Sequence, residues 1–290
     1  MPGMESSREL IGGVLGLDPR ILEDPNDFAL LTLGARNDQV LSFFTPRNRL
    51  LTIAANEVGS APDRILMEWV PPVSRPLPVQ CWKVEGGFLV VPGKKKFDLT
   101  AVRRFPSTGL SMVRDFPGHM RGAVARLTRN AWPDLERRLH DLAGALKLHQ
   151  TEEVELPILR VVGFGPGTLP VGDMALCGML LTGRALGLGS RATVHWLGRL
   201  SMEVRRFLHR TTKFSAEFLN FALEGRTTRC QEMFFGAMAG DFEGAADIAA
   251  SGIMKERDGG GEGFLAGVLM ALDMVRQDFF PAPENANPGF

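Results

Sequence analysis

The sequence predicts an α+β protein in which a strand-rich N-terminal part is followed by a mostly helical C-terminal part. Up to about residue 105, short apolar or alternating runs are separated by turn-forming residues, which is typical of a small antiparallel sheet or barrel. From about residue 117, apolar residues recur at helical spacing over longer segments. We therefore expect two domains, a strand-rich domain over 1–110 and a mainly helical domain over 111–290 that carries two glycine-rich loops.

Six apolar runs in the first hundred residues are expected to be strands. They are Phe28 to Leu33, Val40 to Phe44, Leu50 to Ala54, Ile65 to Val70, Val79 to Val84 and Phe88 to Val91. Gly86-Gly87 stands between the last two runs and predicts a hairpin turn, because glycine accepts the positive φ angles of such turns without steric cost.

The second part of the chain reads as a series of helices. The first opens at Pro133-Asp134 and places leucines 135, 139, 142 and 146 on one stripe. Further helices are expected over 173–187, 190–210, 214–224, 227–239 and 241–251, and from about Phe264 to Gln277. Ser190 and Asp241 are expected as N-caps, and Gly187, Gly225, Gly240 and Gly252 as helix stops. The apolar run Val154 to Val162 is expected to be a strand.

Composition narrows the classes of function. The 290 residues carry a net charge of zero, so no broad basic field is present to attract nucleic acid. We expect no membrane span and no signal peptide, because no apolar segment has the required length and setting. The three cysteines and five histidines show no disulfide framework and no metal-ligand spacing. We therefore expect a cytoplasmic protein with no nucleic-acid or membrane partner, and the sequence identifies no cofactor.

The segment Gly163 to Gly172, followed at once by Asp173, is the most informative stretch of the chain. It holds four glycines and two prolines before an apolar helix pattern. Several N–H groups and a helix dipole converge in such a loop, which makes it a place to hold an anion. It matches neither the dinucleotide fingerprint nor the phosphate loop of nucleotide hydrolases. The alternative is a tight turn with Asp173 as a helix cap or first-turn acid.

A second glycine cluster, Asp258 to Gly263, has a similar layout and contains Glu262. We expect residues 163–173 and 258–267 to lie close together and to line one pocket. Asp173 and Glu262 are the candidate catalytic carboxylates, each with a helix cap as its alternative role. The candidate ligand-binding residues are Gly163, Gly165, Gly167, Thr168 and Gly172 of the first loop, and Gly260 and Gly261 of the second.

Residues 162–178, Val-Gly-Phe-Gly-Pro-Gly-Thr-Leu-Pro-Val-Gly-Asp-Met-Ala-Leu-Cys-Gly, resemble the signature of a bacterial family formerly of unknown function. One member of that family is the AllH-type subunit of oxamate carbamoyltransferase, from allantoin breakdown. The family signature reads Gly-Leu-Gly-Pro-Gly-Leu-Thr-Pro-Ser-Gly-Asp-Asp. Three further segments are similar to family segments, namely Phe97 to Phe105, the Thr/Ser-bearing stretch Thr211 to Leu219, and Arg257 to Gly267.

The chain departs from the family pattern at positions that are polar in the family. The family's Leu-Thr is inverted to Thr168-Leu169, its loop serine is Val171, and its second aspartate is Met174. In the second segment, the family's polar positions fall on Gly259, Gly260 and Gly263. Either Glu262 and Thr168 compensate from shifted positions, or this chain has changed or lost the ancestral chemistry.

The resemblance implies a subunit of a carbamoyltransferase-type complex that acts on a small anionic metabolite, with partner subunits encoded nearby. Oxamate and carbamoyl phosphate are the metabolites implied, in allantoin or purine nitrogen catabolism. N–H donors in a glycine loop suit both a phosphate leaving group and a developing oxyanion. Arg160, Arg184 and Arg257 are candidate cationic partners. A non-catalytic small-anion-binding protein and a structural subunit with a degenerate site remain the alternatives.

Overall fold

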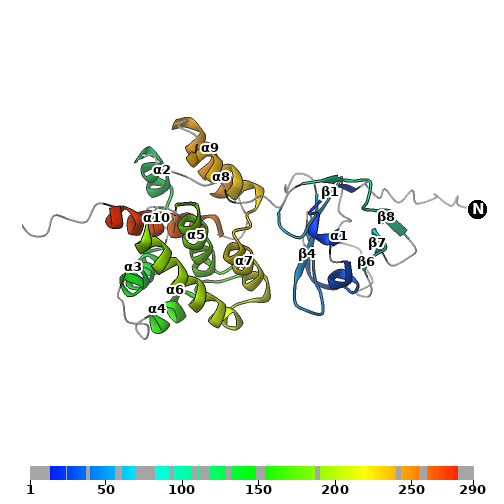
Figure 1. Cartoon of the computed structure of the whole chain (residues 1–290), viewed down its shortest axis with the longest axis horizontal. Coiled ribbons are helices and arrows are strands. Elements are labelled where there is room, and N and C mark those ends of the chain that lie inside the picture. The colour runs from blue at the N-terminus through cyan, green and yellow to red at the C-terminus, as the bar shows by residue number, and fades with distance from the viewer. Residues whose placement is uncertain are drawn as a thin grey trace, which may run out of the picture. The chain divides into compact units, whose positions relative to one another are not determined.

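The structure is a computed structural model of the chain (Figure 1). It describes residues 14–23, 25–36, 40–55, 61–68, 82–91, 95–105, 110, 118–128, 132–147, 154–186, 190–239, 243–254 and 260–279. The chain divides into two compact units, Met1–Ser107 and Thr108–Phe290. All the named strands lie in the first unit, and the second is helical in its described part, which confirms the predicted α+β class.

The first unit contains two sheets. The larger has the order β2-β3-β4-β5-β1-β9, and the smaller has the order β6-β7-β8. The larger sheet is mixed, because β4–β5 and β1–β9 pair in parallel while its other neighbours are antiparallel. Its strands are β1 (Val14–Leu17), β2 (Thr32–Arg36), β3 (Val40–Phe44), β4 (Leu50–Ala55), β5 (Arg64–Met67) and β9 (Arg103–Arg104). The smaller sheet contains β6 (Lys83–Glu85), β7 (Phe88–Val91) and β8 (Lys95–Asp98).

Most of the predicted strands are present, and the first one is displaced. Phe28 ends a 3-10 helix, η1 (Pro25–Phe28), and is fully buried, so its apolar character serves the core rather than a strand. The predicted hairpin is confirmed, because Gly86 and Gly87 connect β6 to β7 with φ angles of 58° and 82°. The short helix α1 (Arg20–Glu23) follows β1 and buries Ile21.

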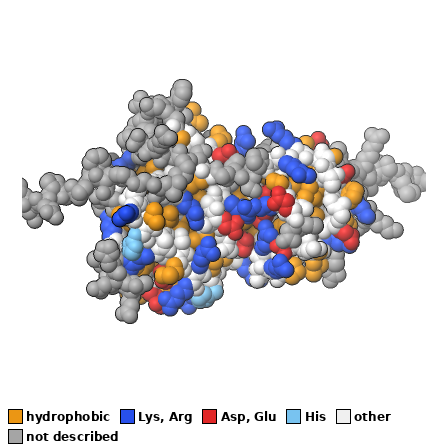
Figure 2. Space-filling view, viewed as in Figure 1, with side chains coloured by type: hydrophobic (Ala, Val, Ile, Leu, Met, Phe, Trp, Pro, Cys, Tyr) orange, Lys and Arg blue, Asp and Glu red, His pale blue; other side chains and the backbone are white. Residues whose placement is uncertain are grey.

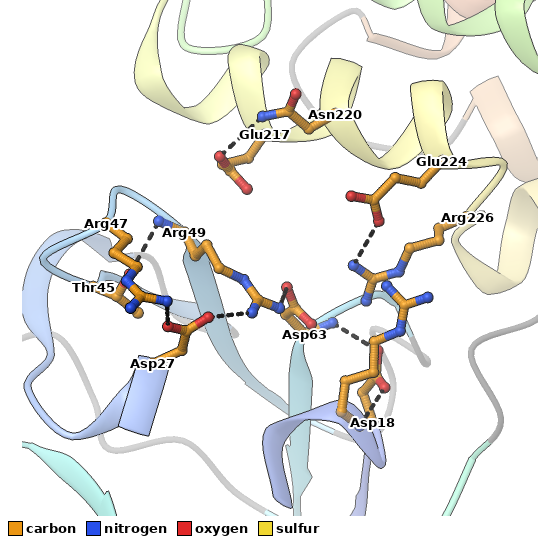
Figure 3. Close-up of polar contacts among 11 residues, drawn as sticks. Asp18, Asp27, Thr45, Arg47, Arg49, Asp63, Glu217, Asn220, Glu224 and Arg226 are labelled. Atoms are coloured by element: carbon orange, nitrogen blue, oxygen red, sulfur yellow. Dashed lines mark hydrogen bonds and ion pairs between the residues drawn. The ribbon is translucent and has the colours of Figure 1, made fainter. Parts of the chain in front are cut away.

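A network of ion pairs around two buried carboxylates joins three connections of the first unit, those before β2, between β3 and β4, and between β4 and β5 (Figure 3). Asp27 accepts from Arg47 at 2.6 Å and from Arg49 at 2.7 Å, and Arg49 also reaches Asp63 at 3.0 Å. The Asp27 and Asp63 side chains are almost fully buried, whereas that of Arg47 is 76% exposed. Arg49 therefore links the two buried carboxylates, and Arg47 adds a second cation at Asp27.

The second unit is built around one buried helix, α5 (Val171–Leu186), in which every residue except Arg184 is buried. Helix α10 (Gly260–Phe279) crosses it so closely that a Cβ atom at Gly267 would lie 1.9 Å from the Ala175 carbonyl oxygen. The helices around this pair are α2 (Gly118–Thr128), α3 (Pro133–Lys147), α4 (Glu155–Val161), α6 (Arg191–Phe207), α7 (Lys213–Glu224), α8 (Arg229–Ala239) and α9 (Glu243–Met254). A short 3-10 turn, η5 (Leu208–Arg210), follows α6.

Several predicted helix boundaries are confirmed. Helix α3 buries all four leucines of the predicted stripe. The Ser190 side chain caps α6 by accepting from the Thr193 N–H, and Gly225 ends α7 with a left-handed φ of 75°. Of the other predicted caps and stops, Gly187, Gly240 and Asp241 lie outside the described residues, as do Arg257, Asp258 and Gly259 of the second glycine cluster.

Three sequence predictions are wrong. The segment 154–162 contains helix α4 (Glu155–Val161) rather than a strand, and its buried positions 154, 158, 161 and 162 follow the helical period. Pro157 is tolerated there because it lies in the first turn, where its missing N–H has no helical acceptor. Gly252 lies inside α9 and does not end it. The second glycine cluster is no free loop from Gly260 onward, because α10 begins at that residue.

The described residues on the face drawn in Figure 2 carry basic and acidic side chains of both signs, interspersed with apolar ones. No helix of the described segments is long and apolar enough to cross a membrane.

Candidate functional site

The glycine-rich segment 163–172 connects α4 to α5 and folds back on itself. Gly163, Gly165 and Gly167 have φ angles of 71°, 107° and 91°, which only glycine adopts readily. The Gly172 N–H donates to the Phe164 carbonyl at 2.8 Å and closes the loop. A Cβ atom at Gly172 would lie 2.1 Å from the Val161 carbonyl oxygen. The glycines are therefore required by the backbone path and its close approaches.

The tip of this loop is open to solvent and carries spare donors. Pro166, Gly167 and Thr168 are exposed, and a Cβ atom at Gly167 would meet nothing within 4 Å. No acceptor in the described part of the chain takes the N–H groups of Gly165, Gly167 or Thr168. Spare backbone donors next to the start of α5 form an arrangement that suits an anion.

The start of α7 lies against the same loop. The Thr212 hydroxyl donates to the Thr168 carbonyl at 2.6 Å and also caps α7 by accepting from the Ser215 N–H at 3.1 Å. A Cβ atom at Gly163 would lie 3.1 Å from the Arg210 carbonyl oxygen. Two helix N-termini, those of α5 and α7, therefore meet at one glycine-rich loop, and their dipoles add positive potential there.

Asp173 links the glycine-rich loop to the start of α7. Its carboxylate accepts from the Gly163 N–H at 2.8 Å, from the Ser215 hydroxyl at 2.7 Å and from the Thr211 hydroxyl. The residue is fully buried in the first turn of α5. Burial raises the pKa of its carboxyl, and the hydrogen bonds from Thr211, Gly163 and Ser215 oppose this rise. Asp173 thus bonds both to the loop and to the α7 start, which goes beyond the role of a first-turn acid.

The Glu262 carboxylate has different surroundings from the Asp173 carboxylate. It lies in the first turn of α10, and its Oε2 accepts from the Trp132 Nε1 at 2.6 Å. It lines a cavity of about 510 Å³ whose walls come from α2, α3 with the preceding Trp132, and α10. Residues 163–173 are all described, and none of them lines this cavity. The structure brings the starts of α5 and α10 together, but it places the two candidate carboxylates in different surroundings.

The contact between the two helix starts is apolar and tight. A Cβ atom at Gly260 would lie 3.4 Å from the Met174 Cγ, and one at Gly263 would lie 2.3 Å from the Val171 carbonyl oxygen. Gly261 is enclosed in the same way by the Ile253 carbonyl. The predicted ligand-binding residues Gly260 and Gly261 are thus buried in helix packing. Four positions at which the chain departs from the family pattern meet in this contact, Val171 and Met174 on one side and Gly260 and Gly263 on the other.

The candidate cations differ in their surroundings. Arg184 donates to the Leu223 carbonyl, and burial lowers the pKa of its guanidinium. Arg160 is half exposed, with its Nη1 3.9 Å from Asp141. Sequence reasoning missed Arg138, whose guanidinium lies 4.1 Å from the centre of the Phe164 ring and donates to the Arg160 carbonyl. Arg138 therefore brings a positive charge against the loop, and no local sequence signal identifies it.

No group of three or more His, Cys, Asp or Glu side chains able to hold a metal ion is found in the described segments. Cys177, one turn after Asp173, is fully enclosed, and burial raises the pKa of its thiol.

Comparison with known proteins identifies one family. Residues 161–272 match the family described as oxamate carbamoyltransferase subunit AllH. This match confirms the predicted resemblance and includes α5, the start of α7 and most of α10. No curated protein matches the chain, and no solved structure matches it.

Proposed function

We propose that this chain is a subunit of a carbamoyltransferase-type complex and that its 163–172 loop binds a small phosphate- or carboxylate-bearing metabolite. The observation that carries the proposal is the loop itself, in which spare N–H groups lie at the meeting point of two helix N-termini. The similarity of residues 161–272 to the AllH subunit supports the assignment to a complex of this kind. We propose oxamate and carbamoyl phosphate as the metabolites that the loop binds.

Electrostatics favour an anion at this place. The α5 and α7 dipoles direct their positive ends to the loop, and Arg138 adds a full charge behind Phe164. The Asp173 carboxylate is bonded to the Gly163 N–H, Thr211 and Ser215, so it does not occupy the spare N–H groups at the loop tip. We assign Asp173 as a positioning residue that keeps the loop and the α7 start in register, rather than as a group that touches the metabolite.

The tight apolar contact argues for weak chemistry by the isolated chain. Val171 and Met174 stand where the family pattern has polar residues, and both are buried against α10. Groups buried in this way cannot activate a substrate without unfolding the contact. We therefore expect this subunit to bind the anion and to depend on partner subunits for turnover. A non-catalytic anion-binding subunit is the second candidate, and the same packing favours it.

The binding step is tested by calorimetric titration of the whole chain with carbamoyl phosphate, inorganic phosphate and oxamate. Gly167→Val should abolish the heat signal, because valine cannot adopt the required φ without strain and would cover the exposed donors. Gly86→Val is the matched control, since Gly86 also has a positive φ and open space around it but lies in the hairpin of the first unit. No heat with any of the three anions would contradict the proposal.

The two candidates are separated by turnover. Carbamoyl transfer between carbamoyl phosphate and oxamate should be absent or very slow with the chain alone and should rise when its genetic neighbours are co-expressed. Activity that never rises above the background, despite anion binding, would favour the non-catalytic subunit. Robust turnover by the isolated chain would contradict our expectation of weak chemistry.

A further inference from the structure

The cavity beside Glu262 is separate from the glycine-rich loop and has its own chemistry. Its volume of about 510 Å³ falls within the range of small-molecule sites. One face of α10 forms its floor, with Glu262 at one end, Ala266, Leu269 and Met270 in the middle, and Asp273 at the other end. At 1.5 Å per residue, the two acids are about 16 Å apart along the helix. The floor is therefore apolar between two carboxylates.

The two carboxylates differ in their charge balance. Asp273 is held by Arg121 through two hydrogen bonds of 2.7 and 3.1 Å, which match its negative charge. Glu262 forms no ion pair with any Lys or Arg among the described residues, and its described partner is the neutral Trp132 N–H. That hydrogen bond fixes the Glu262 carboxylate beside an aromatic ring. Glu136, on the α3 wall, adds a further negative charge.

We propose that this cavity binds a small organic amine. Its ammonium group is held by the Glu262 carboxylate beside Trp132, and its aliphatic body lies on Ala266, Leu269 and Met270. A carboxylate held in place by the Trp132 N–H recognises an ammonium group by a charge-assisted hydrogen bond. Arg126 also lines the cavity, so an amine whose far end carries a carboxylate is compatible with the same site. This ligand is opposite in charge to the one proposed for the glycine-rich loop.

The test uses the whole chain and four probes with the same four-carbon body. They are n-butylammonium, 4-aminobutyrate, butyrate and n-butanol, measured by calorimetry and by thermal shift. We expect the two ammonium compounds to bind and stabilise the protein, and the other two to have no effect. If Arg126 takes part, 4-aminobutyrate should bind more tightly than n-butylammonium, because only 4-aminobutyrate carries a carboxylate.

Glu262→Gln should weaken ammonium binding about tenfold or more, because a hydrogen bond to a charged group is worth about 1.5–3 kcal/mol. Glu85→Gln is the matched control for charge, since Glu85 is exposed in the first unit, and it should bind as wild type does. Ala266→Phe, which fills the apolar floor and keeps Glu262, should also abolish binding. Absence of ammonium binding to the wild type, equal binding of butyrate or butanol, or undiminished binding by both Glu262→Gln and Ala266→Phe would overturn the proposal.

Discussion

Replacing Asp173 by alanine removes the side chain that joins the glycine-rich loop to the start of α7. The Gly163 N–H and the hydroxyls of Thr211 and Ser215 then lose their acceptor, Ser215 in a fully buried place and the other two in a partly buried one. A buried donor without an acceptor costs about 1–3 kcal/mol, and the two hydroxyls can rotate towards other acceptors. We therefore expect the free energy of unfolding to fall by about 3–5 kcal/mol, which is large for a single substitution.

Asparagine at the same position separates shape from charge. Asp173→Asn keeps one oxygen acceptor, and its amide can donate to a hydroxyl that turns round, so we expect a loss of about 1–2 kcal/mol. Urea denaturation followed by circular dichroism measures both variants against wild type. Asp134→Asn is the control, because the Asp134 side chain is 69% exposed and its ion pair with Arg137 lies on the surface.

The pH dependence provides an independent check. Burial raises the folded-state pKa of Asp173 above its ordinary value of 3.8, so the folded chain holds this proton more tightly than the unfolded chain does. The stabilisation that the protonated Asp173 carboxyl gives to the folded state is fully present below pH 3.8. It is lost as the pH rises through the folded-state pKa. The stability difference between wild type and Asp173→Asn should therefore shrink as the pH rises from about 3.8.

A stability of Asp173→Ala within about 1 kcal/mol of wild type would refute the assigned role of Asp173, because one buried and two part-buried donors would then lose their acceptor at too small a cost. A stability difference that grows with pH over the same interval would contradict the assigned cause of the pKa shift. If Asp173→Asn binds the anion as wild type does while Asp173→Ala does not, the positioning role is supported against direct contact with the metabolite.

Three further predictions concern a helix contact, the ion-pair network and the division into domains. Gly263→Ala should lower the free energy of unfolding by about 1–3 kcal/mol, because the new Cβ would meet the Val171 carbonyl, whereas Gly198→Ala in α6, with open space around it, should not destabilise the chain. Arg49→Met should lower the free energy of unfolding by about 1.5–3 kcal/mol in urea denaturation, because it removes the charge-assisted hydrogen bonds of Arg49 to the buried Asp27 and Asp63 carboxylates, and Arg47→Met, at an exposed side chain, should cost less than about 1 kcal/mol. Segments 1–110 and 111–290, expressed separately, should each unfold cooperatively if they are the two domains that we propose, and a molten or insoluble product from both would contradict that division.

Most helices were predictable from the sequence because their signals are local. The leucine stripe of α3, the Ser190 cap and the left-handed Gly225 all depend on residues within one or two turns of each other. The error at α4 has the opposite cause. A short run of valine, isoleucine and leucine suits a strand and a helix equally, and only its burial at 154, 158, 161 and 162 reveals the helical period.

The start of α10 shows a second limit of sequence reasoning. Glycines at 260, 261 and 263 predict a loop, because glycine is entropically unfavourable in a helix. In the structure all three are helical, and at Gly261 and Gly263 the carbonyls of Ile253 and Val171 come too close for a side chain. The packing partner therefore explains glycine inside a helix, and for Gly263 that partner, Val171, is about ninety residues away in the sequence.

The sequence was enough to predict the glycine-rich loop of the candidate site, but it did not predict the side-chain partners of the two carboxylates. The glycine pattern and the family resemblance identify residues 163–173, but nothing local pairs Asp173 with Thr211 and Ser215, or Glu262 with Trp132, 130 residues away. Similar layouts at the two glycine clusters suggested one pocket, whereas side-chain direction separates them. A carboxylate in a helix's first turn can point back to the preceding loop, as at Asp173, or away to a neighbouring helix, as at Glu262. The packing around each helix start selects the direction, so an acid's place in a glycine-rich motif does not by itself assign it to the ligand of that motif.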